Sequence, residues 1–411
     1  MQNNLTKKEI ENLCKWATKY NIEDLDTEEK ILNIKELKIN CACVKDIIPN
    51  EIFKLTTIKK LDLFEDAKIK ELPKEIGNLI NLEELRITYF YELRNIDAIG
   101  NLKNLKHFKI YCGRKLTKLP KEIGNLINLE ALFIDSFHNL KEIPKEIGNL
   151  SKLKILYINC TNLIKLPIEI FNLTNLKALS IGYNKLKKIP KEIGNLTKLE
   201  SLIIINSVHP FCNNLEYIPK EIGNLINLEN LKIKCDKLKE PISWIGKLTK
   251  LKNLEIECED LESLPNEIGN LVKLENLEVG CDRLREISKE IGNLNKLKNL
   301  TIYCKDLKSI PNEIGNVIKL KRLEIKCENL ESLPNEIGNL INLKSIEIES
   351  SALKEIPKEI KKLVNLEDIS IAWGGYAKEL PKEILNGDKL KNIHVTKISH
   401  VYKSVIRKRR K

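Results

Sequence analysis

Cysteine and histidine are the residues of this chain whose spacing could carry chemistry. The sequence has eleven cysteines and five histidines among 411 residues. Eight of the cysteines occupy one slot of a repeated pattern, at Cys41, Cys112, Cys160, Cys235, Cys258, Cys281, Cys304 and Cys327, and the last five are spaced by 23 residues. A series of this kind could form disulfides, ligate a metal or pack as buried thiols.

The histidines offer little catalytic or metal chemistry. None of them pairs with another at the spacing of a metal site or a catalytic triad. The nearest approach to a metal motif is His209-x-x-Cys212, which lacks two further ligands. No glycine-rich phosphate-binding loop appears, because the glycines fall mostly in a recurring Gly-Asn-Leu. We therefore expect no enzyme, no metal and no cofactor.

A repeat positions all of these residues. Leu-Pro-Lys-Glu-Ile-Gly-Asn-Leu or a close variant recurs from Pro49 to Pro381, in fifteen units spaced mostly by 23 or 24 residues. Each unit begins with L-x-x-L-x-I, whose period of two predicts a short strand, and ends with Pro-x-x-Ile-x-x-Leu, whose period predicts a helical turn. Proline suits the first position of such a turn. Because one turn cannot bury its apolar edge alone, the units must stack into a solenoid.

The unit resembles the leucine-rich repeat of the 23-residue LPxxIxxLxxLxxL class, found in bacterial intracellular, plant Ras-group and scribble-type repeat proteins. The resemblance covers roughly residues 31–396. It implies an α/β solenoid, a leucine-rich repeat horseshoe with a parallel concave β-sheet and short helical or 3-10 turns on the convex side. It also implies binding of proteins, peptides, glycans or lipids on one frame, without catalytic residues.

Three segments follow from the pattern. Residues 1–30 are predicted to form an N-terminal helical cap, because Thr6-x-x-Glu9 is a capping box that precedes apolar residues at helical spacing, Ile10, Leu13, Cys14 and Ala17. Residues 31–396 form one solenoid of about 15–16 repeats, since the period runs without a compositional break. Residues 397–411 form a basic tail.

The cysteine slot has the parity of the inward Leu and Ile, because it lies two residues after the strand's Ile. Stacked strands lie ~4.8 Å apart, which places the Cα atoms within disulfide range. Side chains on adjacent parallel rungs, however, point the same way and suit the disulfide torsion poorly. We expect reduced, buried thiols that act as small apolar groups.

Charge separates the tail from the body. Of the formal net charge of +12, residues 397–411 carry +7 and the other residues +5. The tail is open to two interpretations, a nuclear-import or nucleic-acid patch and a solvated terminus. Along the convex turns Lys and Glu alternate, as in Lys74-Glu75 and Lys121-Glu122, which predicts a surface of mixed sign. We expect no nucleic-acid binding through the repeat body.

Targeting signals are not evident. The N-terminal residues lack the apolar core of a secretory signal, and no stretch approaches the ~18 apolar residues of a membrane span. We expect a cytoplasmic monomer without a membrane span. Export by a signal-free route would leave the same sequence, and repeat proteins of this kind also serve pathogens as effectors.

An apolar stripe crosses the concave face in the N-terminal half. By strict alternation, the residues that flank the second Leu and the one after the Ile point out of the sheet. The candidate partner-binding residues at these positions are Tyr111, Ala131, Phe133, Ile155, Tyr157, Ser180, Ile203 and Ile205. The one long insertion, residues 206–214, follows directly and brings His209 and Phe211 to the stripe. Exposed apolar patches with polar rims are typical of contact sites.

The C-terminal half presents a polar face. Asn230, Asn253, Asn276 and Asn299 share one outward slot on successive rungs, and glutamates such as Glu255, Glu257 and Glu278 dominate the others. Two interpretations stay open. The face is either an acidic groove for a basic peptide, including the chain's own tail, or a solvated sheet whose Asn side chains hydrogen-bond laterally.

These observations favour a non-enzymatic interaction module that binds a protein or peptide on the concave face of its N-terminal half. The alternative is a glycan or host cell-surface ligand, bound by a signal-free exported effector. A purely structural spacer is the third hypothesis, and it predicts that concave substitutions have no functional effect.

Overall fold

The computed structural model describes residues 5–44, 48–65, 69–111, 114–182, 184–205, 215–240, 242–374 and 390–397. The chain divides into two compact units, which are described separately. The first unit comprises Met1–Leu199 with Val208–Asn214, and the second comprises Glu200–Ser207 with Leu215–Lys411.

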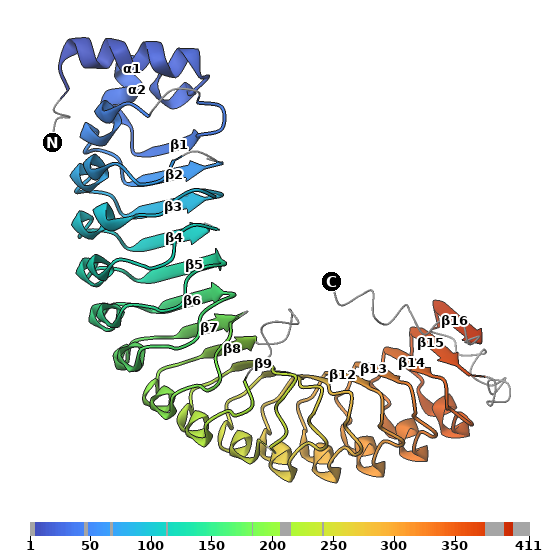
Figure 1. Cartoon of the computed structure of the whole chain (residues 1–411). Coiled ribbons are helices and arrows are strands. Elements are labelled where there is room, and N and C mark those ends of the chain that lie inside the picture. Colours follow the sequence, from blue (N-terminus) through green and yellow to red (C-terminus); the bar gives the residue numbers. More distant parts are fainter. Residues whose placement is uncertain are drawn as a thin grey trace. The chain divides into compact units, whose positions relative to one another are not determined.

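The first unit opens with helices that precede the strands (Figure 1). They are α1 Lys7–Lys19, the 3-10 helix η1 Glu23–Leu25 and α2 Glu28–Asn33. The predicted capping box is confirmed, because Thr6 Oγ1 accepts from the Glu9 N–H and Glu9 Oε2 accepts from the Thr6 N–H. Ile10, Leu13 and Ala17 are buried as expected, whereas Cys14 is only half-buried. Glu9 also pairs with Lys54 Nζ at 2.6 Å, which ties the cap to the first repeat turn.

Seven parallel strands of the first unit stack in sequence order (Figure 1). They are β1 Glu36–Asn40, β2 Lys60–Phe64, β3 Glu84–Thr88, β4 His107–Tyr111, β5 Ala131–Phe137, β6 Ile155–Cys160 and β7 Ala178–Gly182. Each residue pairs with the equivalent residue of the next repeat, for example Leu132 with Leu156. The register shifts once, between Asp135 and Phe137.

The second unit repeats this arrangement. Its strands are β8 Ser201–Ile205, β9 Asn230–Lys234, β10 Asn253–Glu257, β11 Asn276–Gly280, β12 Asn299–Cys304, β13 Arg322–Cys327, β14 Ser345–Ser350, β15 Asp368–Trp373 and β16 Asn392–Lys397. All neighbouring pairs in this unit are parallel. The predicted solenoid of stacked parallel strands is confirmed in both units.

Every repeat turn within the described residues is a five-residue 3-10 helix. In the first unit these are η2 Asn50–Lys54, η3 Lys74–Asn78, η4 Asp97–Asn101, η5 Lys121–Asn125, η6 Lys145–Asn149, η7 Ile168–Asn172 and η8 Lys191–Asn195. In the second they are η9 Lys220–Asn224, η10 Ser243–Lys247, η11 Asn266–Asn270, η12 Lys289–Asn293, η13 Asn312–Asn316, η14 Asn335–Asn339 and η15 Lys358–Lys362.

The proline was expected at the first helical position, and the structure corrects this by one residue. Pro73, for example, is the N-cap of η3, with φ −56° and ψ 138°, and its carbonyl accepts from the Ile76 N–H at 3.1 Å. The N-cap position suits proline equally well, because its N–H would have no partner inside the helix. At Ser288, which replaces proline, the hydroxyl accepts from the Glu290 N–H.

The core lies between the strands and the 3-10 turns. Burial alternates along β2 and β6 as predicted, with Leu61, Leu63, Leu156 and Ile158 at most 2% exposed. Asparagine side chains add a link between neighbouring turns. In the first unit, Asn81 Nδ2 donates to the Thr56 carbonyl at 2.8 Å and Asn104 Nδ2 to the Ile80 carbonyl at 2.8 Å.

Glycine in the turn allows the repeats to approach closely. A Cβ atom at Gly124 in η5 would lie 2.6 Å from the Glu146 carbonyl oxygen of the next repeat. At Gly182 in β7 the nearest atom, in the Asn159 side chain, would lie at 3.5 Å, which is ordinary contact. Stacking of the repeats therefore requires glycine at position 124, whereas position 182 has room for a side-chain methyl group.

We predict that Gly124→Ala lowers the free energy of unfolding by about 1–3 kcal/mol, because the added methyl group overpacks the contact between two turns. Gly182→Ala is the matched control and should change it by less than about 1 kcal/mol, since the methyl group meets no close atom. Urea denaturation of both variants checks this. Equal destabilisation would show that the turns can separate without cost.

Candidate partner-binding surface

We call the face of the sheet that points away from the 3-10 turns the concave face. In the first unit it carries three rows of side chains, because register aligns equivalent positions of β4 to β7. The middle row is Lys109, Phe133, Tyr157 and Ser180. The structure thus places most of the predicted stripe on adjacent rungs of one sheet.

Two aromatic rings lie at the centre of the middle row. Phe133 and Tyr157 are cross-strand partners, with ring centroids 6.2 Å apart and planes inclined by 33°. Lys109 Nζ lies 5.1 Å from the Phe133 centroid, within the range of a cation–π interaction. Both rings are half-buried. The pair is held by its neighbours and still offers aromatic surface to solvent.

Polar groups follow along one side of the rings. The third row contains Tyr111, Asp135 and Asn159, and Asn159 Nδ2 donates to the Tyr157 hydroxyl at 3.4 Å. Burial raises the pKa of the Tyr111 hydroxyl above its usual value, and the nearby Asp135 carboxylate adds to the effect. Tyr111 therefore stays a neutral hydrogen-bonding group near neutral pH.

The remaining predicted residues of this unit differ in exposure. Ile155, in the first row, is 38% exposed and extends the apolar surface beside Tyr157. Ala131 and Ser180 have the expected outward register but are only 5% and 8% exposed. They are small and pair across the sheet with Ile155 and Tyr157, whose larger side chains rise above them. These two positions shape the floor and offer little contact area.

Ile203 and Ile205 belong to β8 of the second unit and are half-buried there. Their partners on β9 are Lys232 and Lys234, so the apolar character ends one rung later, as the sequence indicates. His209 and Phe211, with the rest of the insertion 206–214, lie outside the described residues.

The polar face of the second unit is internally bonded. Asn253, Asn276 and Asn299 each donate from Nδ2 to Oδ1 of the asparagine on the preceding rung, beginning at Asn230. The lateral hydrogen bonds considered from the sequence are thus present. They consume much of the polar capacity that a ligand would need.

The glutamates of this face are largely paired. Lys232 contacts Glu255 at 2.6 Å, and Lys234 contacts both Glu255 and Glu257. Glu324 is buried and bonded by Tyr303, Arg322 and Lys326. Although burial opposes ionisation of Glu324, the hydrogen bonds from Lys326, Arg322 and Tyr303 lower its pKa to about 2. Glu278 forms no ion pair with a described residue, and its carboxylate lies within 4.8 Å of those of Glu255 and Glu257. The face therefore keeps one small acidic cluster among largely paired glutamates.

The cysteine ladder is buried as predicted. Cys41, Cys160, Cys235, Cys258, Cys281, Cys304 and Cys327 are all at most 5% exposed, with free thiols. Cys112 lies outside the described residues. Burial raises the pKa of the Cys258 thiol well above its usual value, and the thiols of Cys235 and Cys281 contribute. The ladder thus packs as part of the core.

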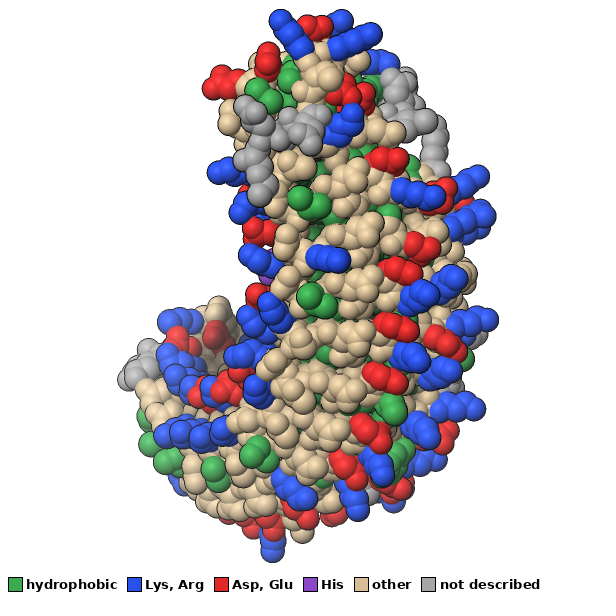
Figure 2. Space-filling model, turned by 90° about the vertical axis from the view of Figure 1, so that its left-hand side faces the viewer, with side chains coloured by type: hydrophobic (Ala, Val, Ile, Leu, Met, Phe, Trp, Pro, Cys, Tyr) green, Lys and Arg blue, Asp and Glu red, His purple; other side chains and the backbone are tan. Residues whose placement is uncertain are grey.

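Charges of both signs cover the outer surface. Figure 2 shows basic and acidic side chains interspersed over the visible face of the repeats, without a continuous patch of one sign. The mixed surface predicted for the convex turns is confirmed on that face. No helix among the described residues is long and apolar enough to cross a membrane.

Family comparison agrees with this geometry. A model described as a leucine-rich repeat region matches residues 10–141, 136–243, 212–312 and 241–349. The chain belongs to the leucine-rich repeat family. Leucine-rich repeat proteins generally act as non-enzymatic binding modules, typically in protein–protein interaction. No curated protein matches this leucine-rich repeat chain with significant sequence similarity.

Solved structures show the same fold. A leucine-rich repeat protein of Leptospira interrogans is 31% identical, with a TM-score of 0.77 over 92% of this chain and 95% of that one. The internalin InlF of Listeria monocytogenes is 20% identical, with a TM-score of 0.63 over 91% and 98%. Toll of Drosophila, in its complex with Spätzle, is 16% identical, with a TM-score of 0.67 over 88% and 54%. The last two likenesses concern the fold alone.

We predict that the ladder thiols of this leucine-rich repeat protein react slowly with iodoacetamide under native conditions. Burial excludes the reagent and raises the thiol pKa, so Cys258 and Cys281 should label only as the stack opens. The exposed Cys43 serves as an internal control and should label first. Mass spectrometry of timed digests measures each site. Labelling of Cys258 as fast as Cys43 would contradict its inward position.

Proposed function

We propose that this leucine-rich repeat protein binds a protein or peptide partner on the concave face of its first unit. The observation that carries the proposal is the half-exposed Phe133–Tyr157 pair beside Ile155, surrounded by the polar groups of Lys109, Tyr111 and Asn159. Aromatic residues with a polar rim are typical of interface centres. The site proposed here comprises residues of the first unit alone, since Ile203 and Ile205 belong to the second unit and His209 and Phe211 lie outside the described residues.

Ring geometry favours a protein over a glycan. Sugars stack on flat, freely accessible rings, whereas Phe133 and Tyr157 are tilted against each other and Lys109 lies over the Phe133 ring. An aliphatic or aromatic side chain can fill the space beside tilted rings and bury more apolar area. A glycan or host cell-surface ligand is the second candidate, supported only by the exposed Tyr89 and Tyr91 rings beyond β3.

The proposal includes no catalytic step. We propose binding as the whole activity, with residues 1–30 as a cap, 31–396 as the solenoid and 397–411 as a basic tail. Toll, which the chain resembles in fold, is seen in a complex with Spätzle, and binding of a partner is proposed here for this chain.

Affinity capture from source lysate tests the proposal, followed by titration of the captured partner. Phe133→Ala combined with Tyr157→Ala should weaken binding by at least about tenfold, because truncating aromatic anchors at an interface centre typically costs about 2 kcal/mol or more. Both side chains are half-exposed, so the free energy of unfolding should fall by less than in Leu156→Ala, which should cost about 2–5 kcal/mol.

A matched control removes exposed apolar groups that lie outside the strands of the concave face. Ile164 and Ile168 are 50% and 57% exposed beside and within η7, and Ile164→Ala with Ile168→Ala should leave binding unchanged. Equal loss in the two double variants would point to a general effect of lost apolar surface. Unchanged binding in the aromatic variant would favour the spacer hypothesis.

A further inference from the structure

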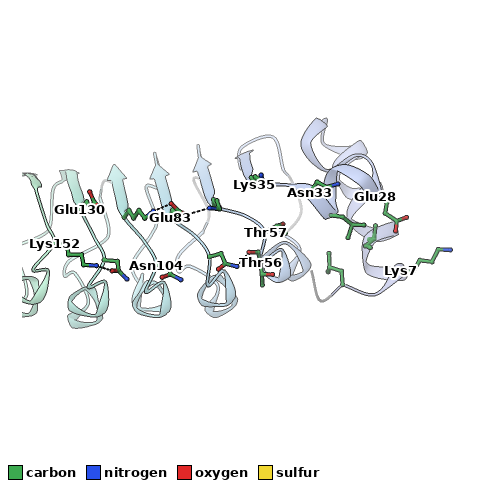
Figure 3. Close-up of a pocket in the computed structure, with 17 residues that line it drawn as sticks. Lys7, Glu28, Asn33, Lys35, Thr56, Thr57, Glu83, Asn104, Glu130 and Lys152 are labelled. Atoms are coloured by element: carbon green, nitrogen blue, oxygen red, sulfur yellow. Dashed lines mark hydrogen bonds and ion pairs between the residues drawn. The ribbon is translucent and has the colours of Figure 1, made fainter. Parts of the chain in front are cut away.

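A trough runs along the flank of the first unit, beside the ends at which the strands begin (Figure 3). It has a volume of about 1170 Å³ and extends from the N-terminal cap to Lys152. It is separate from the concave face, because its lining comes from the cap, the turns before the strands and the residues that enter the strands. The sequence-based prediction did not include it.

Charged residues that enter the strands form one wall, called the strand-entry row. In the trough this row is Lys35, Lys59, Glu83, Lys106 and Glu130. Where Lys and Glu alternate, they pair: Glu83 contacts Lys59 at 2.9 Å and Lys106 at 2.6 Å (Figure 3). These hydrogen bonds lower the pKa of Glu83 to about 2. Both oxygens of this carboxylate are thus occupied.

The alternation fails next to the cap. Lys35 and Lys59 lie on successive rungs, so two lysines are neighbours in this part of the row. The next residues along the two chains, Glu36 and Lys60, pair with each other in the register of β1 and β2. Lys59 is bound to Glu83, while Lys35 forms no ion pair with any residue that the structure describes. Lys7, also in the lining, is likewise unpaired within the described part of the chain. An uncompensated positive charge therefore faces this end.

The lining of the trough as a whole carries a net positive charge. Five lysines and three glutamates contribute to the trough. Glu83 is neutralised from two sides, and Glu130 is paired with Lys154 at 2.7 Å. Glu28 in α2 is the one lining carboxylate without such a partner among the described residues. A ligand that carries a negative charge next to Lys35 is favoured over one that carries a positive charge.

Apolar side chains lie at the same end. Leu5, Ile10 and Leu32 line the trough where the cap meets the first repeat, and Leu32 is 38% exposed. Further along, Asn104 uses Nδ2 to bond the Ile80 carbonyl, while its Oδ1 accepts no hydrogen bond from a described residue. That oxygen can accept a backbone N–H. The trough thus combines an apolar contact, an ammonium group and an amide acceptor.

From these features we infer that the trough binds the C-terminal end of an extended peptide. The terminal carboxylate pairs with Lys35, the last side chain is apolar and packs against Leu32 and Leu5, and the preceding backbone runs over the turns toward Asn104. A chain terminus fits because cap residues line one end, where a continuing chain would meet the cap helices. Six rungs at ~4.8 Å span about 24 Å, enough for about seven extended residues.

An array of synthetic hexapeptides that end in Leu tests this, with every sequence present as a free acid and as a carboxamide. Labelled full-length protein should bind a subset of the free acids. For the best binder, anisotropy titration should show about tenfold or greater loss in the amide, because a charge-assisted hydrogen bond is removed. If no free acid binds more tightly than its amide, the inference is overturned.

Variants locate the site. Lys35→Glu should abolish binding of the free-acid peptide, and Leu32→Ser should weaken it several-fold. Lys121→Glu in η5 makes the same charge change outside the trough and should retain binding. Unchanged affinity in Lys35→Glu would contradict the inference. The double variant Phe133→Ala with Tyr157→Ala should bind the free-acid peptide as tightly as the unaltered protein does. A negative result for the proposed concave-face site would therefore not bear on peptide binding in the trough.

Discussion

Stacking of equivalent residues is the constraint on which the rest of the structure depends. Parallel register places each side chain directly against its counterpart one repeat away, as with Leu132 and Leu156 in the core. The same alignment acts on every row. It produces the asparagine ladder of the second unit, the buried thiols of Cys235 to Cys327 and the Lys–Glu pairs of the strand-entry row. A change in one repeat is therefore felt first by its two neighbours.

This constraint explains why binding features appear where a row changes its residue type. The middle row of the concave face becomes aromatic at Phe133 and Tyr157, and the strand-entry row loses its alternation at Lys35 and Lys59. Within uniform stretches, neighbouring side chains satisfy one another, as the asparagines do. Where the pattern is interrupted, surface or charge is left for a ligand. The two proposed sites of the first unit share this origin.

The sequence predicted the strands, the inward Leu and Ile and the cysteine ladder, because these depend on the periodicity of the repeat. It predicted the capping box because that depends on a local motif, Thr6 and Glu9 three residues apart. The sequence-based prediction placed the prolines one residue too far into the turn, at the first helical position and not at the N-cap. The sequence pattern does not distinguish the start of a 3-10 helix from the start of an α-helix. The low exposure of Ala131 and Ser180 and the pairing of Glu255 by Lys232 depend on the size and reach of side chains on neighbouring rungs. The trough was missed because its lining residues come from rows that look purely structural within a single repeat.

The strand-entry row also bears on how such an array can change its length by recombination. Loss of the single repeat that carries Glu83 would bring Lys59 beside Lys106, two like charges on adjacent rungs. Loss of two consecutive repeats, those with Glu83 and Lys106, would instead bring Lys59 beside Glu130 and restore an opposite pair. The hydrophobic core is nearly indifferent to the choice, since the described repeats bury the same kinds of residue. Surface electrostatics in this stretch thus favours gain and loss of repeats in pairs.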